Sequence, residues 1–185
     1  MFVRTQRLTL RPGWREDAAE LARAIGHESV VRNLARAPWP YTIEAAETFA
    51  AGFDGPAEPR FLIFEHSQGA LRLVGGIGIG PFEKEANEFG YWITPDAWGR
   101  GLATEAGEAV LRAACAAGIR RVVAGHFLDN PASGRVLRKL GFRPTGRVTQ
   151  VYSRGRGAAV ASARFEIDLA ETGAADNDPR ARMAA

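Results

Sequence analysis

The stretch WGRGLATEA, residues Trp98–Ala106, joins a glycine-rich turn to the start of a helix. ITPDA precedes it, and a run rich in alanine and leucine follows. The first N–H groups of a helix lack partners within it and carry the positive end of the helix dipole. Glycines at such a start let an anion approach the backbone without a Cβ in the way, and Arg100 adds positive charge. The alternative is a tight turn in which the glycines serve the turn alone.

The composition sets the broad class of the protein. The chain has 185 residues, 46% of them hydrophobic, which predicts one domain with a sizeable core. We expect that domain to cover residues 1–170 and the small, polar residues 171–185 to form a disordered tail. No apolar run approaches the roughly 20 residues of a membrane span. The N-terminus, MFVRTQRLTL, alternates as a strand does and lacks the layout of a signal peptide.

Charge and cysteine content narrow the possible partners. The formal net charge is +3, and no lysine/arginine block interleaves with aromatic residues, so nucleic acid is not expected as a partner. Basic residues can still serve an anionic small molecule. Cys115 is the single cysteine, so no internal disulfide can form, which fits a reducing cytoplasm. Its place in an alanine-rich helix predicts a small core side chain rather than a nucleophile.

The hydrophobic periodicity predicts a mixed α/β fold without internal repeats. We expect strands over residues 3–11, 60–66, 71–81, 87–93, 121–128, 142–153 and 159–169. We expect helices over residues 14–25, 42–53, 102–117 and 131–140. Thr42 and Asn130 are suited to cap two of these helices, and Gly118 and Gly141 to end two of them. The tip RGRG at residues 154–157 is typical of a hairpin turn.

Other phosphate and metal signatures carry little weight. The sequence has no G-x-x-x-x-G-K-[ST] loop. The run GGIGIG (Gly75–Gly80) resembles a dinucleotide fingerprint, but PFEKE follows it instead of a helix, which indicates a glycine-rich strand of the kind that a bulge interrupts. His27, His66 and His126 fall in three separate elements, so we expect core or surface histidines and no bound metal.

Several motifs occur together in a fixed order along the chain. They are RLTLRP (Arg7–Pro12), PWPYTIE (Pro38–Glu44), GYWI (Gly90–Ile93), WGRGLATEA (Trp98–Ala106) and NPASGRVLRKLGF (Asn130–Phe142). With the order of strands and helices, they resemble the GNAT superfamily of acyl-CoA-dependent N-acetyltransferases. Within it, the chain looks most like the ribosomal-protein N-terminal acetyltransferase branch. The resemblance extends from Thr5 to Leu169 and implies the GNAT fold, a mixed, mostly antiparallel sheet flanked by helices.

The resemblance also implies a site for acetyl-CoA and no metal. The pyrophosphate would lie on the amides of Gly99, Arg100, Gly101, Leu102, Ala103 and Thr104, where the glycines had already indicated an anion. The pantetheine arm would pair like an extra strand with the backbone of Trp92, Ile93 and Thr94. Asn130 and Ser133 would border its other side. An N–H near Ile93 would then stabilise the oxyanion that forms on the thioester carbonyl.

The chemistry requires a base for the acceptor ammonium and an acid for the leaving thiolate. Glu88 is the candidate base, because it shares a strand face with Gly90 and Trp92 near the expected acyl group. It can equally be a solvated strand residue. Many GNAT enzymes use a tyrosine as the acid, at a position that Leu137 holds here. Ser133 matches a substitute proposed in the resembling branch, and it can equally be a helix residue that bonds backbone.

These features predict acetyl transfer from acetyl-CoA to a primary amine by direct attack in a ternary complex. A peptide or protein N-terminal amine ranks first, because its pKa of about 7.7–8.0 leaves far more free base at neutral pH than a lysine at about 10.4. Small amines, amino acids or antibiotics rank second, and polyamines third. A coenzyme-binding GNAT module without turnover is the alternative class. We expect a cytoplasmic monomer or homodimer without a membrane partner.

Overall fold

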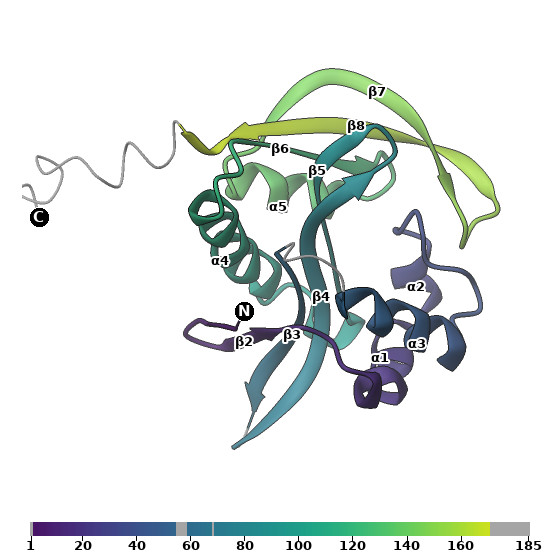
Figure 1. The fold of residues 1–185 in the computed structure, drawn as a ribbon. Helices are drawn as coiled ribbons and strands as arrows, with labels where there is room; N and C mark the ends of the chain where they lie inside the picture. Colours follow the sequence, from purple (N-terminus) through teal and green to yellow (C-terminus); the bar gives the residue numbers. More distant parts are fainter. Residues whose placement is uncertain (1, 55–58, 68, 171–185) are drawn as a thin grey trace, which may run out of the picture.

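The computed structural model describes residues 2–54, 59–67 and 69–170 (Figure 1). The tail expected over residues 171–185 lies outside the described residues. The helices are η1 (Arg15–Asp17), α1 (Ala18–Ile25), α2 (Glu28–Val31), α3 (Ile43–Ala51), η2 (Gly52–Asp54), η3 (Pro95–Ala97), α4 (Leu102–Ala116) and α5 (Pro131–Lys139). The strands are β1 (Val3–Arg4), β2 (Leu8–Arg11), β3 (Arg60–Ser67), β4 (Ala70–Phe82), β5 (Glu85–Ile93), β6 (Arg121–Phe127), β7 (Arg143–Ser153) and β8 (Ala158–Asp168). Within these described ranges, no helix is long and apolar enough to cross a membrane.

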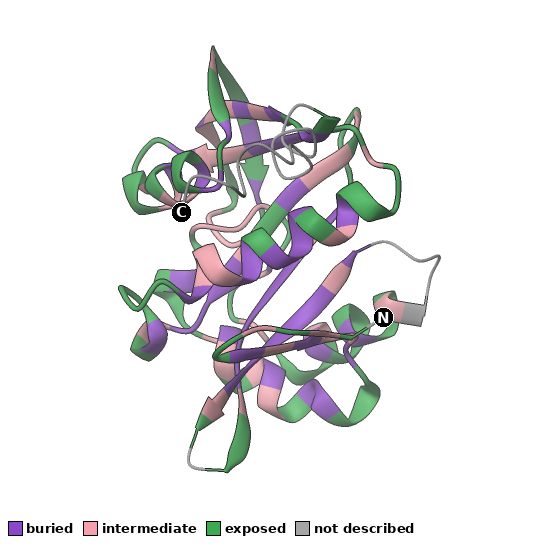
Figure 2. Cartoon of the chain, turned by 90° about the vertical axis from the view of Figure 1, so that its left-hand side faces the viewer, coloured by how far each residue is buried: buried purple, intermediate pink, exposed green. Residues whose placement is uncertain are grey.

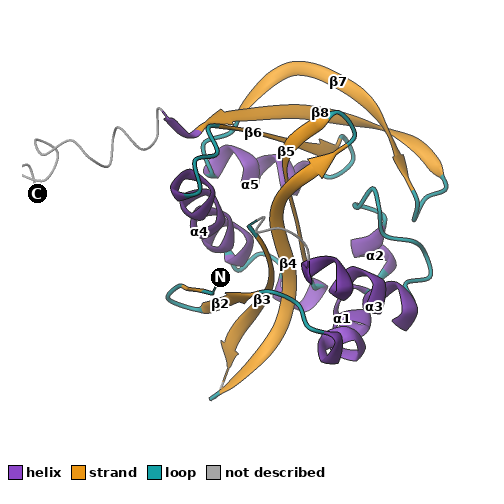
Figure 3. Cartoon of the chain, viewed as in Figure 1, coloured by secondary structure: helices purple, strands orange, loops and turns teal. Residues whose placement is uncertain are grey.

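Eight strands form one sheet in the order β1-β2-β3-β4-β5-β6-β8-β7. All neighbours are antiparallel except β5 and β6, which run parallel. This is the mixed, mostly antiparallel sheet that the resemblance to the GNAT superfamily implies, and it curves between two groups of helices (Figure 3). The helices α1, α2 and α3 lie on one side, and α4 and α5 lie on the other (Figure 1).

The central strands are buried on both faces because helices cover both. For this reason β3 has a continuous apolar run instead of alternating apolar and polar residues. Alternate residues of that run face opposite sides of the sheet. Phe61 and Ile63 join the core that contains α4, whereas Leu62 and Phe64 join the core that contains α1. Figure 2, which looks at the molecule from the α4 side, shows buried residues along the strands and exposed residues on turns and outer helix faces.

The N-terminal segment differs from the single strand expected over residues 3–11. It forms two strands, β1 and β2, which pair antiparallel after a tight turn. The Thr5 hydroxyl accepts a hydrogen bond from the Leu8 N–H at 3.0 Å. The Glu105 carboxylate of α4 accepts from the Thr5 hydroxyl at 2.6 Å and from the Arg7 N–H at 2.9 Å. A partner so distant in the chain leaves no trace in the local alternation, so the turn was not predicted.

The first expected helix differs as well, because one 3-10 turn, η1, precedes α1. The Asp17 carboxylate fixes this start by accepting from the Trp14 N–H at 2.7 Å and from two Arg11 nitrogens, each at 2.7 Å. Burial alone raises the pKa of Asp17, but the Arg11 and Trp14 hydrogen bonds outweigh it and hold the pKa below its ordinary value. Arg11 also stacks on the rings of Trp14 and Phe64, so the pair anchors α1 against the sheet.

The other elements agree with the predicted limits to within two residues, except that α2 and the 3-10 turn η3 were not expected. Four residues are too few to show a helical period. Thr42 and Asn130 cap α3 and α5 by accepting N–H bonds at 3.3 and 3.4 Å. Gly118 and Gly141 end α4 and α5 with φ angles of 83° and 89°. The bulge suspected in the glycine-rich strand lies in β4, where its register against β3 shifts.

Cys115 is a correction to the sequence analysis, because the structure leaves it exposed. The helix α4 turns Ala106, Ala109, Val110 and Ala114 into the core. Cys115 follows this stripe by one residue, which is about 100° round the helix. Its Sγ lies 3.8 Å from the Leu169 carbonyl oxygen.

Candidate functional site

The parallel strands β5 and β6 meet along only part of their length. Their pairing joins Glu88 to Val123 and Phe89 to Ala124, and no further pair is found between them among the described residues. Beyond Phe89, β5 continues to Ile93 beside β4 alone. The two strands therefore separate and leave an opening in the middle of the sheet.

The backbone of β5 offers alternate residues to this opening. The Thr94 N–H donates to the Val74 carbonyl at 2.9 Å, so Thr94 is bonded toward β4. Because antiparallel ladders alternate, Trp92 also bonds toward β4, whereas Tyr91 and Ile93 turn their backbone groups to the opening. The indole N–H of Trp98 donates a hydrogen bond to the Ile93 carbonyl at 2.6 Å. The Ile93 N–H and both backbone groups of Tyr91 remain facing the opening.

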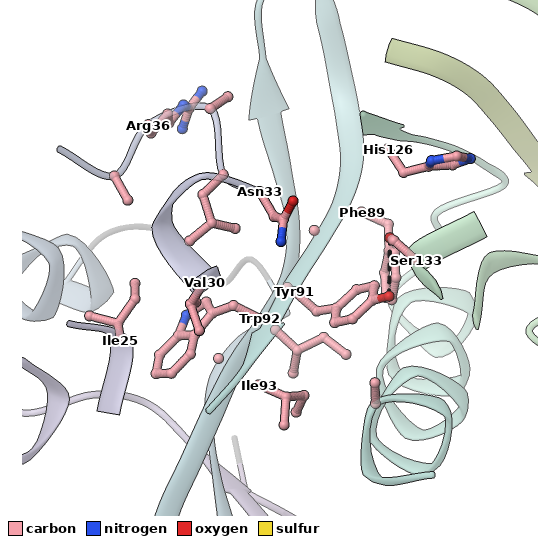
Figure 4. A pocket seen from close by; sticks show the side chains of 18 of the residues that line it. Ile25, Val30, Asn33, Arg36, Phe89, Tyr91, Trp92, Ile93, His126 and Ser133 are labelled. Atoms are coloured by element: carbon pink, nitrogen blue, oxygen red, sulfur yellow. Dashed lines mark hydrogen bonds between the residues drawn. The ribbon is translucent and has the colours of Figure 1, made fainter. Parts of the chain in front are cut away.

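One cleft of about 1240 Å³ passes through the opening and reaches both faces of the sheet. Its lining includes every site residue predicted from the sequence except Thr94 and Arg100. One half lies between the β5 edge, α4 and α5. The other half lies against α3 and the segment before it. Figure 4 shows Ile25, Val30, Asn33 and Arg36 on that second side, with Tyr91 and Trp92 pointing to opposite sides of β5.

The start of α4 forms a concave backbone surface in the first half of the cleft. Gly99 and Gly101 adopt φ angles of 74° and 77°, which L-residues rarely adopt. The Gly101 carbonyl accepts from Thr104 and Glu105, each at 3.1 Å. The N–H groups of Gly101, Leu102 and Ala103 have no acceptor among the described residues. This is the geometry of an anion site at a helix N-terminus.

Arg100 does not add free charge to that surface. Its guanidinium binds the Glu65 carboxylate through both terminal nitrogens, one of them at 3.1 Å from Oε2. Glu65 is 6% exposed, and a buried carboxylate requires such a partner. The other guanidinium at this loop belongs to Arg7, which donates to the Arg100 carbonyl at 2.9 Å and pairs with Glu105 at 2.7 Å. The exposed amides therefore provide positive potential at this loop that no carboxylate compensates among the described residues.

A pair of hydroxyl groups lies between β5 and α5. The Tyr91 hydroxyl donates to the Ser133 Oγ at 3.1 Å (Figure 4). Burial raises the pKa of Tyr91, and the Ser133 contact offsets this only in part, so Tyr91 stays protonated at neutral pH. Leu137, which holds the position of the family's tyrosine, is 1% exposed in the core. Sequence reasoning missed Tyr91, although its place in GYWI beside Trp92 was a signal.

Glu88 lies at the point where β5 and β6 separate, and it is bound by Arg164 of β8. The guanidinium donates to both carboxylate oxygens, at 2.6 and 3.1 Å, and both side chains are largely buried. Burial alone lowers the pKa of Arg164, but the hydrogen bonds to Glu88 outweigh it and raise that pKa. Gly125 of β6 lies between them, and a Cβ there would come within 2.5 Å of the Arg164 guanidinium. No local feature of the sequence indicates this cross-sheet pair.

The histidines lie apart from one another. The Nδ1 of His126 is 2.9 Å from the Phe127 carbonyl oxygen, and its ring packs against Phe165. His66 lies on β3, where its Nε2 is 2.8 Å from the Thr9 hydroxyl. In the part of the chain that the structure describes, no group of three or more His, Cys, Asp or Glu residues is arranged to hold a metal ion.

Comparison with known proteins places the chain in a family. The family model for the acetyltransferase (GNAT) domain matches residues 7–143. A relative from Bacillus subtilis (strain 168), the uncharacterized N-acetyltransferase YoaA, is 30% identical over 161 residues, which cover 83% of this chain and 90% of YoaA. The chain therefore belongs to the GNAT acetyltransferase family.

Two solved structures share the fold at low sequence identity. RimL, a ribosomal L7/L12 alpha-N-protein acetyltransferase solved with coenzyme A, has a TM-score of 0.73 and 18% identity, covering 91% of this chain and 98% of RimL. The microcin C7 self immunity acetyltransferase MccE, solved with acetyl-CoA and AMP, also has a TM-score of 0.73 and 18% identity, covering 89% of this chain and 93% of MccE. Both likenesses show the GNAT fold.

Proposed function

We propose that the protein transfers the acetyl group of acetyl-CoA to a primary amine, with a peptide or protein N-terminus as the preferred acceptor. The observation that carries the proposal is the cleft through the opening between β5 and β6. Two molecules can enter it from opposite faces of the sheet and meet inside it. Membership of the GNAT family supports acetyl transfer, and the likeness to RimL supports an N-terminal acceptor.

Acetyl-CoA fits the half of the cleft between α4 and α5. We propose that its pyrophosphate lies on the amides from Gly99 to Thr104, since three of these N–H groups have no acceptor among the described residues. The pantetheine arm would run along β5, between that strand and Asn130 and Ser133. Its hydrogen bonds would go to Tyr91 and Ile93 rather than to Thr94, whose N–H is already bonded within the sheet.

The reaction in this arrangement needs no covalent enzyme intermediate. The amine nitrogen attacks the thioester carbonyl carbon, the C–S bond breaks, and the amine loses a proton while the thiolate gains one. The Ile93 N–H faces the opening and is suited to stabilise the carbonyl oxyanion. Cys115, at the far end of α4, does not line the cleft.

Ser133 and Tyr91 together can protonate the leaving thiolate. Because the Ser133 oxygen accepts from Tyr91, its own proton is free to point toward the cleft. When Ser133 gives up its proton, the Tyr91 hydroxyl would stabilise the Ser133 oxygen through the hydrogen bond that it donates. We propose that this pair supplies the hydroxyl that Leu137 cannot. The gain is limited because a thiolate with a pKa of about 8.5 leaves readily without help.

Glu88 is the proposed proton acceptor for the amine. Its carboxylate lines the cleft, and the Arg164 guanidinium holds both of its oxygens in place. An α-amine suits a weak base because its pKa is about 7.7–8.0, so a sizeable fraction is deprotonated without assistance. A lysine side chain would need a stronger base.

The coenzyme proposal is tested by one substitution at each end of α4. Gly101→Ala should raise the Kd for acetyl-CoA at least tenfold, because the added Cβ, 3.7 Å from an Arg7 guanidinium nitrogen, would stand in the open space beside the loop that we propose for the pyrophosphate. Gly118→Ala is the matched control, since Gly118 also has a left-handed φ, of 83°, but lies away from the cleft. Each change should cost about 1 kcal/mol of unfolding free energy through backbone strain. Calorimetry with equal affinities for both variants would refute the phosphate site.

The acceptor is tested by following release of coenzyme A with a panel of amines. A short peptide with a free N-terminus should react faster than the same peptide with a blocked N-terminus and a free lysine. Spermidine and an aminoglycoside should be slower than the free N-terminus. Faster reaction of the blocked peptide or of spermidine would overturn the order. Acetyl-CoA binding without release for any amine would instead indicate a coenzyme-binding module.

The proton-transfer roles are tested by kinetics at several pH values. Ser133→Ala and Tyr91→Phe should each lower kcat by about tenfold or more with acetyl-CoA affinity unchanged, and the double variant should lose little further. Tyr152→Phe, at an exposed position on β7, is the control. Glu88→Gln should lose most activity near neutral pH and regain part of it where the amine deprotonates by itself. Additive losses at Ser133 and Tyr91, or a wild-type pH profile for Glu88→Gln, would contradict these roles.

A further inference from the structure

The turn between β7 and β8 docks on the segment that links α2 to α3. The Arg154 N–H donates to the Ala35 carbonyl at 2.9 Å, and the buried Ser153 hydroxyl donates to the Leu34 carbonyl at 3.0 Å. Gly155 lies so close to Val31 that a Cβ would come within 2.5 Å of its side chain. The RGRG sequence therefore forms the predicted hairpin turn and closes one side of the half of the cleft that lies against α3.

Four arginines meet at this contact, and two of them are neutralised. Arg156 donates to both Asp129 oxygens at 2.7 and 3.0 Å, and Arg32 reaches the same carboxylate at 3.4 Å. Neither Arg32 nor Arg156 lines the cleft. These two arginines hold the docked turn in place.

The other two arginines, Arg36 and Arg154, line the cleft and have no carboxylate partner among residues 2–54, 59–67 and 69–170. Arg36 donates to the Pro81 carbonyl at 2.7 Å and stacks on the Phe82 ring. Arg154 donates to the Arg36 carbonyl at 3.4 Å, so the two residues are neighbours. Each guanidinium has five N–H donors, most of which these contacts leave free. Two exposed guanidinium groups that line the same half of the cleft without a carboxylate partner there favour an anionic ligand.

We infer that the acceptor carries a carboxylate close to its amine and that Arg36 and Arg154 bind this group. The inference rests on the proposed function, because it takes this half of the cleft as the acceptor side. The acidic residues that line the cleft do not cancel the charge, since Glu88 is bound by Arg164 and Glu44 forms no ion pair with either arginine among the described residues. A guanidinium binds a carboxylate through paired N–H bonds, which gives both affinity and orientation.

Two sources provide such a carboxylate beside an amine. One is an aspartate or glutamate side chain at the second or third position of a peptide with a free N-terminus. The other is the α-carboxylate of a free amino acid. The shared chemistry is the same, and the two sources are separated by pairing each acidic ligand with its neutral amide analogue.

The test measures acceptor binding by calorimetry with the full chain, in the presence of coenzyme A, which has no acetyl group to transfer. The ligands are a peptide with aspartate at positions two and three, the same peptide with asparagine there, free alanine, and alaninamide. We expect one acidic ligand to bind at least tenfold more tightly than its neutral analogue. Arg36→Gln and Arg154→Gln should each reduce this ratio about tenfold. Arg120→Gln, an exposed arginine outside the cleft, is matched in charge and should leave the ratio unchanged.

The outcomes separate the inference from the proposed function. Equal binding of acidic and neutral ligands, or an unchanged ratio in both cleft variants, would overturn the inference even if amines are acetylated. A large ratio that Arg120→Gln reduces as much would also overturn it, because the effect would then come from net charge. Preference for the acidic ligand without any acetylation would support the inference and contradict the proposed function.

Discussion

The separation of β5 from β6 after Phe89 is the constraint on which the site depends. A continuous sheet would satisfy the backbone groups of Tyr91 and Ile93 and would block passage from one face to the other. Two paired positions hold the parallel strands together, and the rings of Phe89 and Phe142 fill the core beneath them, with centroids 5.5 Å apart. The helices α4 and α5 then border the opening and bring the start of α4 to its edge.

Around the site, the buried or partly buried carboxylates are each bound by an arginine, whereas some positive groups have no carboxylate partner among the described residues. Glu65 binds Arg100, Glu88 binds Arg164, and Glu105 binds Thr5 and Arg7. Burial alone raises the pKa of Glu105, but those hydrogen bonds outweigh it and lower that pKa, so the carboxylate stays ionised and paired. The amides at the start of α4 on one side of the opening, and Arg36 and Arg154 on the other, have no carboxylate partner among the described residues.

Local signals explain why most of the fold could be predicted from the sequence. The apolar run of β3, the caps at Thr42 and Asn130, and the glycine after α4 act within a few residues, and each was predicted correctly. From the family motifs, the loop at Gly101 and the start of α5 were expected at one site, and both line the same cleft. The proton-transfer roles assigned to Glu88 and Ser133 remain proposals.

Contacts between distant segments explain what could not be predicted. The turn at Thr5 depends on Glu105, the pairing of Glu88 depends on Arg164, and the docking of the β7–β8 turn depends on Asp129, which binds Arg156 and Arg32. The hydroxyl pair of Tyr91 and Ser133 likewise joins a strand to a helix that follows it at a distance. No sequence spacing indicates these partners, because they are far apart in the chain and become neighbours only in the folded structure.

The most direct test of the account is amide hydrogen exchange along β5, resolved by residue, with and without coenzyme A. In the free protein the Thr94 amide should exchange slowly because it is bonded to Val74, whereas the Ile93 amide should exchange quickly. Coenzyme A should slow exchange at Ile93 and leave Thr94 unchanged. Saturating coenzyme A with no protection at Ile93 would contradict the claim that the open edge of β5 receives the coenzyme.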